Sequence, residues 1–257
     1  MVNQTMVRAL RKVTIERGED PREFALVAFG GAAGLHVCDV ARDLGATEIL
    51  VPPSPGTFSA LGMLMSDVVR IYTETVLNRI EGPVTLGSLI PVFERLEEDA
   101  NQTLATEGFR QTKIKLARSV DVRYRGQSFT LNVPATEGYE NLFHKAHRGL
   151  YGNANPEAPV EVVTVRLEAR GITDRPSFEN QPLRRRRSEA AEVGRRSLRL
   201  QGKEAPVPIY DRERLEPGNS LAGPALIVEY GATTLIPQDF QLRVDAFRTL
   251  VISKRRR

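Results

Sequence analysis

Glycines that follow a short apolar run are the residues of this sequence whose type and spacing could do chemistry. The run Ala25–Phe29 ends in Gly30 and Gly31, and Gly34 follows where apolar residues begin to recur at helical spacing. Glycine permits positive φ and lets a ligand approach the backbone closely, and the free amides at a helix N-terminus favour an anion. The pattern predicts a strand, a tight turn and a helix, with either an anion or a closely packed neighbour at the turn.

The spacing of these glycines excludes the commonest nucleotide-binding loops. Gly30, Gly31 and Gly34 do not match the G-x-G-x-x-G pattern of a dinucleotide-binding domain, and no G-x-x-x-x-G-K-[ST] phosphate loop occurs in the chain. A glycine-rich turn is by itself a weak indication of a ligand. On the residues alone, tight packing is the favoured interpretation.

The elements that would position the turn form a compact βαβ-like unit. The helix after the turn is expected to end near Gly45, and the apolar run Ile49–Val51 gives a second strand. Residues 52–56 contain three prolines and a glycine, which predicts a rigid loop at the exit of this unit.

Two polar residues near these elements are candidates for the edge of a cleft. His36 falls in the first turn of the predicted helix, and Thr57 or Ser59 could cap a short helix that runs through Ser66. We predict that His36 and Ser59 border a nucleotide or substrate cleft. A histidine that only packs at the start of the helix is the alternative.

Several separated blocks of the chain, in the same order, resemble the hydantoinase/oxoprolinase family. This family includes the A-type component of N-methylhydantoinase, 5-oxoprolinase and the beta subunit of acetone carboxylase. The resemblance covers nearly the whole chain, and several blocks in register are more specific than any one of them. The blocks are ALVAFGGAAGLH (Ala25–His36), VPPSPGTFSALGMLMSDV (Val51–Val68), DVRYRGQSF (Asp121–Phe129), VEVVTVRLEARG (Val160–Gly171) and GPALIVEYGATTLIP (Gly223–Pro237).

The resemblance implies a fold like that of the actin, Hsp70 and hexokinase ATPases, with ATP held between two lobes. Gly30, Gly31, Ala32 and Gly34 then look like the adenosine-side turn and are the candidate cofactor-binding residues, with Mg²⁺ expected beside ATP. The phosphate-binding and catalytic-acid segments of such enzymes lie upstream of Met1, so the resemblance assigns no catalytic residue here. We therefore expect an incomplete site, and a short chain that is inactive alone.

The resemblance also implies a reaction and partners. ATP would activate the carbonyl of a cyclic amide of the hydantoin or 5-oxoproline type for hydrolysis, with a hydantoinase B-type subunit taking part and a homo-oligomer expected. An acetone carboxylase beta-type subunit is the closest alternative, because it shares the same motifs. A non-catalytic module for the assembly of the enzyme is the alternative from a different class.

The expected fold class is α/β plus α+β. Residues 1–80 are expected to form the C-terminal end of the actin-like ATPase domain, 81–171 an α+β unit, 172–201 a basic linker and 202–257 a small β-rich domain. The elements expected in the α+β unit are a helix at 86–108, a hairpin at 113–133, a helix at 139–151 and a strand at 160–171.

The composition favours a globular protein and disfavours several other classes. Of the 257 residues, 41% are hydrophobic and 26% charged, which are ordinary values. No run of 18 or more apolar residues occurs, so we expect no membrane span and a cytoplasmic location. The net charge of +4 is concentrated in basic runs near 184–199 and 254–257, which predict a solvated linker and terminus rather than a nucleic-acid surface.

The other residues capable of chemistry have simpler expected roles. Cys38 is the single cysteine, so an intrachain disulfide is excluded and core filling is expected. His144 and His147 would share a helix face that could hold a metal, but local hydrogen bonding is favoured and no metal site is expected. Arg123 and Arg125 would share a strand face that could bind an anion, although an exposed face or a subunit contact is favoured.

Overall fold

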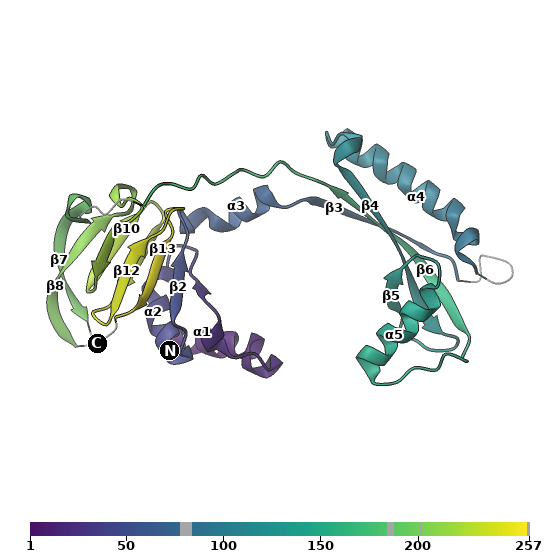
Figure 1. Ribbon diagram of the computed structural model, residues 1–257, viewed down its shortest axis with the longest axis horizontal. Coiled ribbons are helices and arrows are strands. Elements are labelled where there is room, and N and C mark those ends of the chain that lie inside the picture. The colour runs from purple at the N-terminus through teal and green to yellow at the C-terminus, as the bar shows by residue number, and fades with distance from the viewer. Residues whose placement is uncertain (78–83, 184–187, 201, 256–257) are drawn as a thin grey trace. The chain divides into compact units, whose positions relative to one another are not determined.

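The computed structural model of this chain describes residues 1–77, 84–183, 188–200 and 202–255. In that part, the chain divides into two compact units (Figure 1). The first unit combines Met1–Leu64 with Pro176–Arg257, and the second is Met65–Arg175.

The first sheet of the first unit contains the predicted βαβ arrangement. β1 (Leu26–Val27) pairs in parallel with β2 (Glu48–Val51), and α2 (Ala33–Leu44) connects the two strands. Parallel neighbours require such a crossover, and α2 ends at Gly45, whose φ of 78° is left-handed. The prediction of a strand, a glycine turn, a helix and a second strand is confirmed.

The same sheet continues into the C-terminal part of the chain. β13 (Leu250–Lys254) pairs antiparallel with β2, and β12 (Phe240–Val244) and β9 (Ser220–Ala222) follow, in the order β1-β2-β13-β12-β9 (Figure 1). The consecutive residues at 250–252 are all buried, as in a strand covered on both faces and paired on both edges. The expectation that 202–257 forms a domain of its own is therefore wrong, because β13 inserts between β2 and β12.

A second sheet of this unit has the strand order β11-β10-β8-β7. β8 (Lys203–Asp211) lies between β7 (Glu192–Leu200) and β10 (Ala225–Glu229), and β10 forms a hairpin with β11 (Ala232–Ile236). Side chains from both sheets and from α2 form one apolar core. Its members with the least exposure include Ala41, Ile49, Ile227, Ile236, Phe240, Leu242, Leu250 and Ile252.

β7 corrects one part of the expected linker at 172–201, since 192–200 form a strand, whereas 172–183 contain no helix or strand. Its exposed positions carry arginines, and it pairs antiparallel with β8 along one edge of the sheet. An edge strand with one free side needs few apolar residues, and charged side chains protect it against unwanted pairing. The low apolar content that predicts a linker is thus also the composition of an edge strand. The basic run at 184–187 lies outside the described residues.

Two further helices belong to the first unit. α1 (Val2–Val13) packs Val7 against Val40 and Leu44 of α2. α3 (Phe58–Met65) follows the proline loop and has no fully buried residue; its last residue is assigned to the second unit.

The second unit is an antiparallel sheet with helices packed on it. Its order is β3-β6-β4-β5, with β3 at Val68–Thr75, β6 at Val160–Gly171, β4 at Ile114–Tyr124 and β5 at Leu131–Pro134. The helices are α4 (Leu86–Thr106) and α5 (Tyr139–Tyr151). The helices, hairpin and strand predicted for this region are confirmed.

The core of the second unit lies between its sheet and one apolar face of α4. α4 has its apolar residues at helical spacing on one face, and Phe93, Leu89 and Leu104 are completely buried against the sheet. A capping box between Thr85 and Ser88 fixes the start of this helix.

No helix among the described residues is long and apolar enough to cross a membrane. Short 3-10 helices occupy several of the connections. The 3-10 helices lie at Ile15–Arg17, Pro21–Glu23, Pro55–Thr57, Gln111–Lys113, Ser188–Ala191 and Arg212–Arg214.

Candidate functional site

Gly30 opens the predicted strand-to-helix turn with a conformation that glycine favours. Its φ is 89°, and its amide donates a 2.7 Å hydrogen bond to the carbonyl oxygen of Pro55. A Cβ atom added at Gly30 would meet no atom within 4 Å. The turn therefore needs glycine for its backbone angle, and the space beside Gly30 is open.

The other glycines of this region are explained by close packing against the β10–β11 hairpin. Cβ atoms added at Gly31 and Gly56 would lie 3.0 Å and 2.8 Å from the carbonyl oxygen of Gly231. A Cβ at Gly34 would lie 2.7 Å from the carbonyl oxygen of Thr233 and closer still to a side-chain oxygen of the same hairpin. We call these five glycines, 30, 31, 34, 56 and 231, the glycine junction.

The junction joins segments far apart in the sequence. The amide of Thr233 donates to the carbonyl oxygen of Gly31 at 3.3 Å, which ties the hairpin to the start of α2. The N-cap of α2 is Ala32, which makes no side-chain capping bond, so the first amides of this helix have no side-chain acceptor from the cap. Gly31 and Gly34 fit the packing interpretation, and the binding of ATP by this turn remains a prediction.

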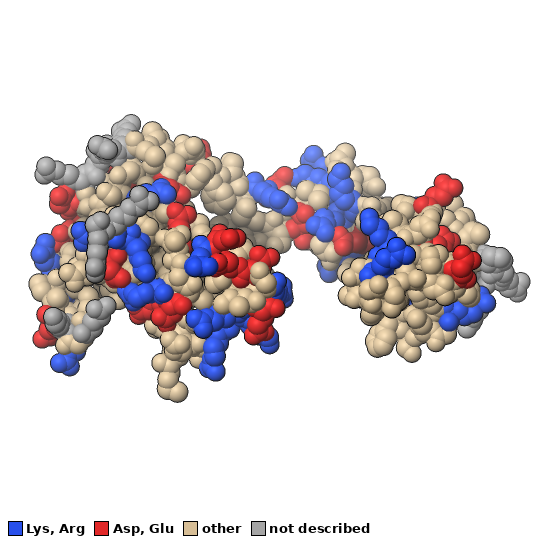
Figure 2. Space-filling model, turned by 60° about the horizontal axis from the view of Figure 1, so that its bottom comes forward, with Lys and Arg blue, Asp and Glu red and all other residues tan. Residues whose placement is uncertain are grey.

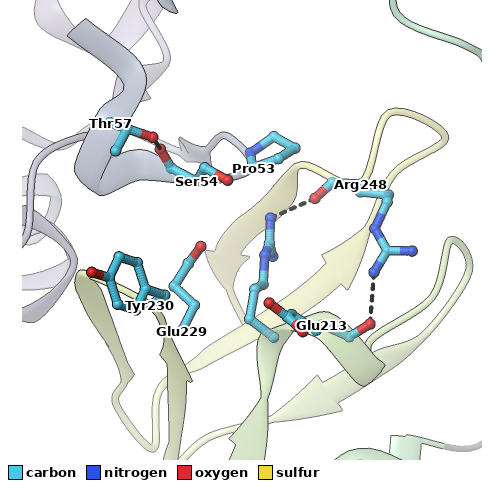
Figure 3. A pocket seen from close by; sticks show the side chains of 8 residues that line it. Pro53, Ser54, Thr57, Glu213, Glu229, Tyr230 and Arg248 are labelled. Carbon is cyan, nitrogen blue, oxygen red and sulfur yellow. Dashed lines mark hydrogen bonds between the residues drawn. The ribbon is translucent and has the colours of Figure 1, made fainter. Parts of the chain in front are cut away.

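A cavity of about 460 Å³ lies next to the junction, between the loop that follows β2 and the strands of the second sheet. In Figure 3, Glu229 and Tyr230 lie on one side of the cavity, Glu213 and Arg248 on the other, and Pro53 and Ser54 along a third. Thr57 and Arg212 also line it, so that we call it the Arg212 cavity.

Arg212 is the buried cation of this cavity. Arg212 is 6% exposed. Its Nη2 atom donates hydrogen bonds to the carbonyl oxygen of Arg248 and to that of Val51, the latter at 3.4 Å. Burial lowers the pKa of the guanidinium to about 10, so the group is still protonated at neutral pH. Its buried Nη1 has no hydrogen-bond partner among the described residues.

Glu229 supplies a half-buried carboxylate to the same cavity. Burial raises its pKa, while the charge of Arg212 and a backbone hydrogen bond from Ser54 oppose that increase. Ser54 has a φ of 51° and Arg248 a φ of 62°, left-handed values that are uncommon for residues other than glycine. Arg248 is held by hydrogen bonds from Nη2 to the carbonyl oxygens of Glu213 (2.8 Å) and Leu215 (3.1 Å).

Comparison with protein families matches both parts of the chain. The family description "Hydantoinase/oxoprolinase" matches residues 1–72, and "Hydantoinase/oxoprolinase C-terminal domain" matches residues 85–255. The chain belongs to the hydantoinase/oxoprolinase family.

Curated relatives of this hydantoinase/oxoprolinase chain are much longer than it is. An uncharacterised protein of Methanocaldococcus jannaschii is 35% identical over 99% of the chain and 37% of its own length. The alpha subunit of caprolactamase from Pseudomonas jessenii is 29% identical over 97% of the chain and 38% of its own length. The chain thus spans less than two fifths of these relatives.

Solved structures support the fold. Acetone carboxylase in its nucleotide-free form superposes with a TM-score of 0.84 at 20% identity, over 99% of the chain and 39% of that protein. The ATP-dependent caprolactamase of Pseudomonas jessenii superposes with a TM-score of 0.66 at 28% identity, with the same coverage. The mixed α/β character expected from the sequence agrees with these folds.

The structure places His36 and Ser59 on different helices of the family fold. The Nδ1 atom of half-buried His36 lies 2.8 Å from Oδ1 of Asn3 in α1, and because that oxygen can only accept, Nδ1 carries the proton. Ser59 is exposed on α3. The hydrogen bonds of the described residues do not join the two, and their placement at a cleft remains a prediction.

The histidines of α5 make local bonds. Nδ1 of His144 lies 2.9 Å from the hydroxyl of Tyr124, and Nδ1 of His147 lies 2.7 Å from the carbonyl oxygen of Asn153. Among the described residues, no group of three or more histidine, cysteine, aspartate or glutamate side chains could hold a metal ion. The favoured interpretation, local hydrogen bonding, describes both rings.

The remaining candidates also have structural partners. Nε of Arg123 donates to Glu161 at 2.7 Å and Nε of Arg125 lies 3.9 Å from the same carboxylate, so both charges face an acid of the sheet. Cys38 is buried in the core as expected, and burial raises the pKa of its thiol to about 12.

Positive and negative side chains are mixed on the face of the first unit that Figure 2 shows. In β7, Arg195 forms an ion pair with Glu192 at 2.8 Å.

Arg212, Glu229 and Arg248 were missed by sequence reasoning. Arg212 stands in the charged run 211–214 and looks like any exposed residue of that run, and the three residues meet at one cavity only after β8, β10 and the β12–β13 turn are assembled. The available signal was the block at Gly223–Pro237, which holds Glu229 directly before the Gly231 turn.

Proposed function

We propose that this chain is the C-terminal part of an ATP-dependent hydrolase of cyclic amides of the hydantoin or 5-oxoproline type. The observation that carries the proposal is the Gly30 turn, where the backbone is open to a ligand at the start of α2 in a chain of this family. The caprolactamase relative is ATP-dependent, and its name specifies a cyclic amide as substrate. An amide is stabilised by resonance, so its carbonyl must be activated before the ring opens.

The residues of the turn fit the adenosine side of ATP. Gly31 and Gly34 are packed on the hairpin, which leaves the Gly30 side and the first amides of α2 for the nucleotide. Phe29, which is 48% exposed, and Phe58 lie with ring centroids 5.7 Å apart and offer apolar surface beside the turn. ATP would supply the phosphoryl group that activates the amide, and these residues would bind and orient its adenosine part.

The remainder of the activity is assigned to parts outside this chain. We propose that 1–80 belongs to an actin-like ATPase domain whose other segments bind the phosphates and Mg²⁺, because phosphoryl transfer needs metal, phosphate-binding amides and a positioned base together. Further copies of the same polypeptide and a hydantoinase B-type subunit would complete a cytoplasmic enzyme. The 257-residue chain alone would then be inactive.

Binding of ATP to the isolated chain tests the half-site. We expect a Kd in the millimolar range or weaker by isothermal titration calorimetry, because the turn provides contacts to one side of the nucleotide. Micromolar binding would overturn the proposal that the phosphate site lies elsewhere.

The intact enzyme that contains this chain tests the reaction. Gly30→Ala should raise the KM for ATP at least tenfold, because the new Cβ occupies the open side of the turn, while Gly62→Ala in α3 serves as the matched control. Turnover of hydantoin or 5-oxoproline is expected. Carboxylation of acetone with bicarbonate instead would establish the acetone carboxylase type, and an enzyme that binds its partner without turning over either class would establish the assembly module.

A further inference from the structure

We propose that the Arg212 cavity binds a small dipolar molecule that carries a carboxylate together with an ammonium or amide N–H group, as an amino acid does. The site is separate from the Gly30 side of the turn, and it does not depend on the function proposed above. Arg212 would hold the carboxylate and Glu229 the N–H group.

The unpartnered nitrogen of Arg212 is the first observation. More than nine tenths of this residue is buried, Nη2 is engaged by backbone carbonyl oxygens, and buried Nη1 lacks an acceptor among the described residues. Leaving such a donor unsatisfied is unfavourable, and a charged donor makes its strongest hydrogen bonds to oxyanions. Arg212 lines the cavity, so a ligand carboxylate there would lie beside this incompletely paired cation.

The second observation is that the nearby carboxylate does not neutralise this cation directly. The charges of Arg212 and Glu229 affect each other's pKa. No ion pair within 4.0 Å joins the two residues in the described part of the chain. Two opposite charges are therefore held apart on the wall of one cavity. A ligand with separated charges of its own can contact both.

The charge balance of the cavity decides between a dipolar ligand and a simple anion. Its lining contains Arg212 and Arg248 but also Glu213 and Glu229, so its formal charge is zero. A phosphate or an isolated carboxylate would gain from Arg212 while it was repelled by Glu229, whereas a dipolar ligand gains at both ends. A volume of about 460 Å³ is within the range of small-molecule pockets.

The walls of the cavity are fixed before any ligand arrives. Ser54 and Arg248 hold left-handed backbone angles, and both the carbonyl oxygen and the side chain of Arg248 are hydrogen-bonded. Non-glycine residues keep such angles where the surrounding structure enforces them, and these positions cluster at ligand sites. Preorganised walls reduce the entropy lost on binding.

Titration of the 257-residue chain in the absence of nucleotide tests the proposal. Glycine and beta-alanine are the dipolar probes, acetate and inorganic phosphate the anionic ones, and methylammonium the cationic one, with binding measured by calorimetry. We expect at least one dipolar probe to bind tenfold or more tightly than every singly functional probe. Equal or tighter binding of acetate or phosphate, or no binding of either dipolar probe, would overturn the proposal.

Variants then locate the bound molecule. Arg212→Met should weaken the dipolar probe at least tenfold. Arg243→Met is the matched control, because Arg243 is an exposed arginine of β12 that forms a long ion pair with Glu48, at 3.9 Å. Glu229→Gln keeps the shape of the cavity and is the decisive variant if Arg212→Met does not fold. It should weaken the dipolar probe at least fivefold and leave acetate binding unchanged or tighter, because the charge that repels acetate is removed. A folded Glu229→Gln protein with wild-type affinity for the dipolar probe would refute the assignment.

Discussion

The loop at 52–57 contributes both to the glycine junction and to the Arg212 cavity, and the two regions differ in what fills the space between backbone segments. At the junction, Gly56 meets the carbonyl oxygen of Gly231 so closely that no side chain fits. At the cavity, Ser54 faces a volume of about 460 Å³ bordered by charged side chains. Neighbouring residues of one loop therefore serve tight packing on one side and an open polar space on the other.

The difference shows which structural features a local sequence pattern can predict. The junction is encoded by small residues at fixed spacing, because close approach depends on the absence of a Cβ. The cavity depends on which long side chains arrive from distant strands.

The largest expected effect on stability is at Gly34 of the glycine junction. Gly34→Ala places a methyl group 2.7 Å from the carbonyl oxygen of Thr233, so α2 or the hairpin must move. We expect the free energy of unfolding to fall by about 3 kcal/mol, the upper end of the usual cost of an overpacked core. Urea unfolding of the chain followed by circular dichroism measures this change.

Gly62→Ala in α3 is the control for that substitution. A Cβ at Gly62 meets no atom within 4 Å, and alanine favours the helix over glycine by about 0.5–1 kcal/mol. We expect this variant to be as stable as the wild type or slightly more stable. Equal stability of Gly34→Ala and Gly62→Ala would show that the junction tolerates side chains and that its glycines serve something other than packing.

The fold could be predicted as far as local periodicity specified it. The alternation of strand, turn and helix around Gly30 and the helical face of α4 follow from spacing alone, and the structure agrees with both. The pairing of β13 with β2 could not be predicted, because β2 ends at residue 51 and β13 begins at residue 250. Edge strand β7 could not either, because its exposed arginines resemble a linker.

The candidate site divides in the same way. Gly30 and Gly31 were found from their spacing, and tight packing, which the residues alone favour, is what the structure shows at Gly31 and Gly34. Arg212 carries no local signature, since a buried arginine in a β-rich segment looks like an exposed one until the opposing strands are known. His36 was noticed for its helix position, but its partner Asn3 comes from α1, whose packing on α2 no local pattern fixes.

The second expected effect uses a titratable group on the packed side. Burial raises the pKa of Cys38 from about 9 to about 12, so above pH 9 the unfolded chain loses this proton before the folded chain does. The free energy of unfolding should therefore fall as the pH rises above 9. At pH 10 it should be about 1.4 kcal/mol lower than well below pH 9.

The difference between the wild type and Cys38→Ala isolates this contribution. Urea unfolding of both proteins at pH 8, 9 and 10 should give a stability difference that changes in this interval, because the alanine variant lacks the thiol. Tyr139, whose pKa burial also raises to about 12, is present in both proteins and cancels. A constant difference from pH 8 to pH 10 would mean that water reaches the thiol and that α2 is not closely packed on β11.

The third expected effect is at the open glycine of the turn. Gly30→Ala meets no neighbouring atom but must adopt a φ of 89°, which costs an alanine about 1–2 kcal/mol. The loss of stability should be smaller than for Gly34→Ala, although both substitutions add the same methyl group. A loss at Gly30 that equals or exceeds the loss at Gly34 would contradict the distinction between an open and a packed glycine.

The smallest expected effect is on the charged side. Burial raises the pKa of Glu229, so the folded state holds its proton at pH values where the unfolded state has released it. The wild type therefore loses stability as the pH rises from about 4 through the folded pKa, and Glu229→Gln does not. At pH 7 we expect Glu229→Gln to be more stable than the wild type by under about 1 kcal/mol, because the charge of Arg212 and the Ser54 amide offset part of the burial.

The pH dependence distinguishes this cause from a change in packing. The advantage of Glu229→Gln should disappear near pH 4, where the wild-type carboxyl group is protonated as well, whereas a packing effect would persist at every pH. Glu229→Gln is also expected to bind the dipolar probes more weakly. If the same variant is more stable than the wild type, the wild-type carboxylate lowers the free energy of unfolding and favours binding, as is usual for residues that bind a ligand. A variant that is less stable than the wild type at pH 7 would instead assign Glu229 a structural role in holding Ser54.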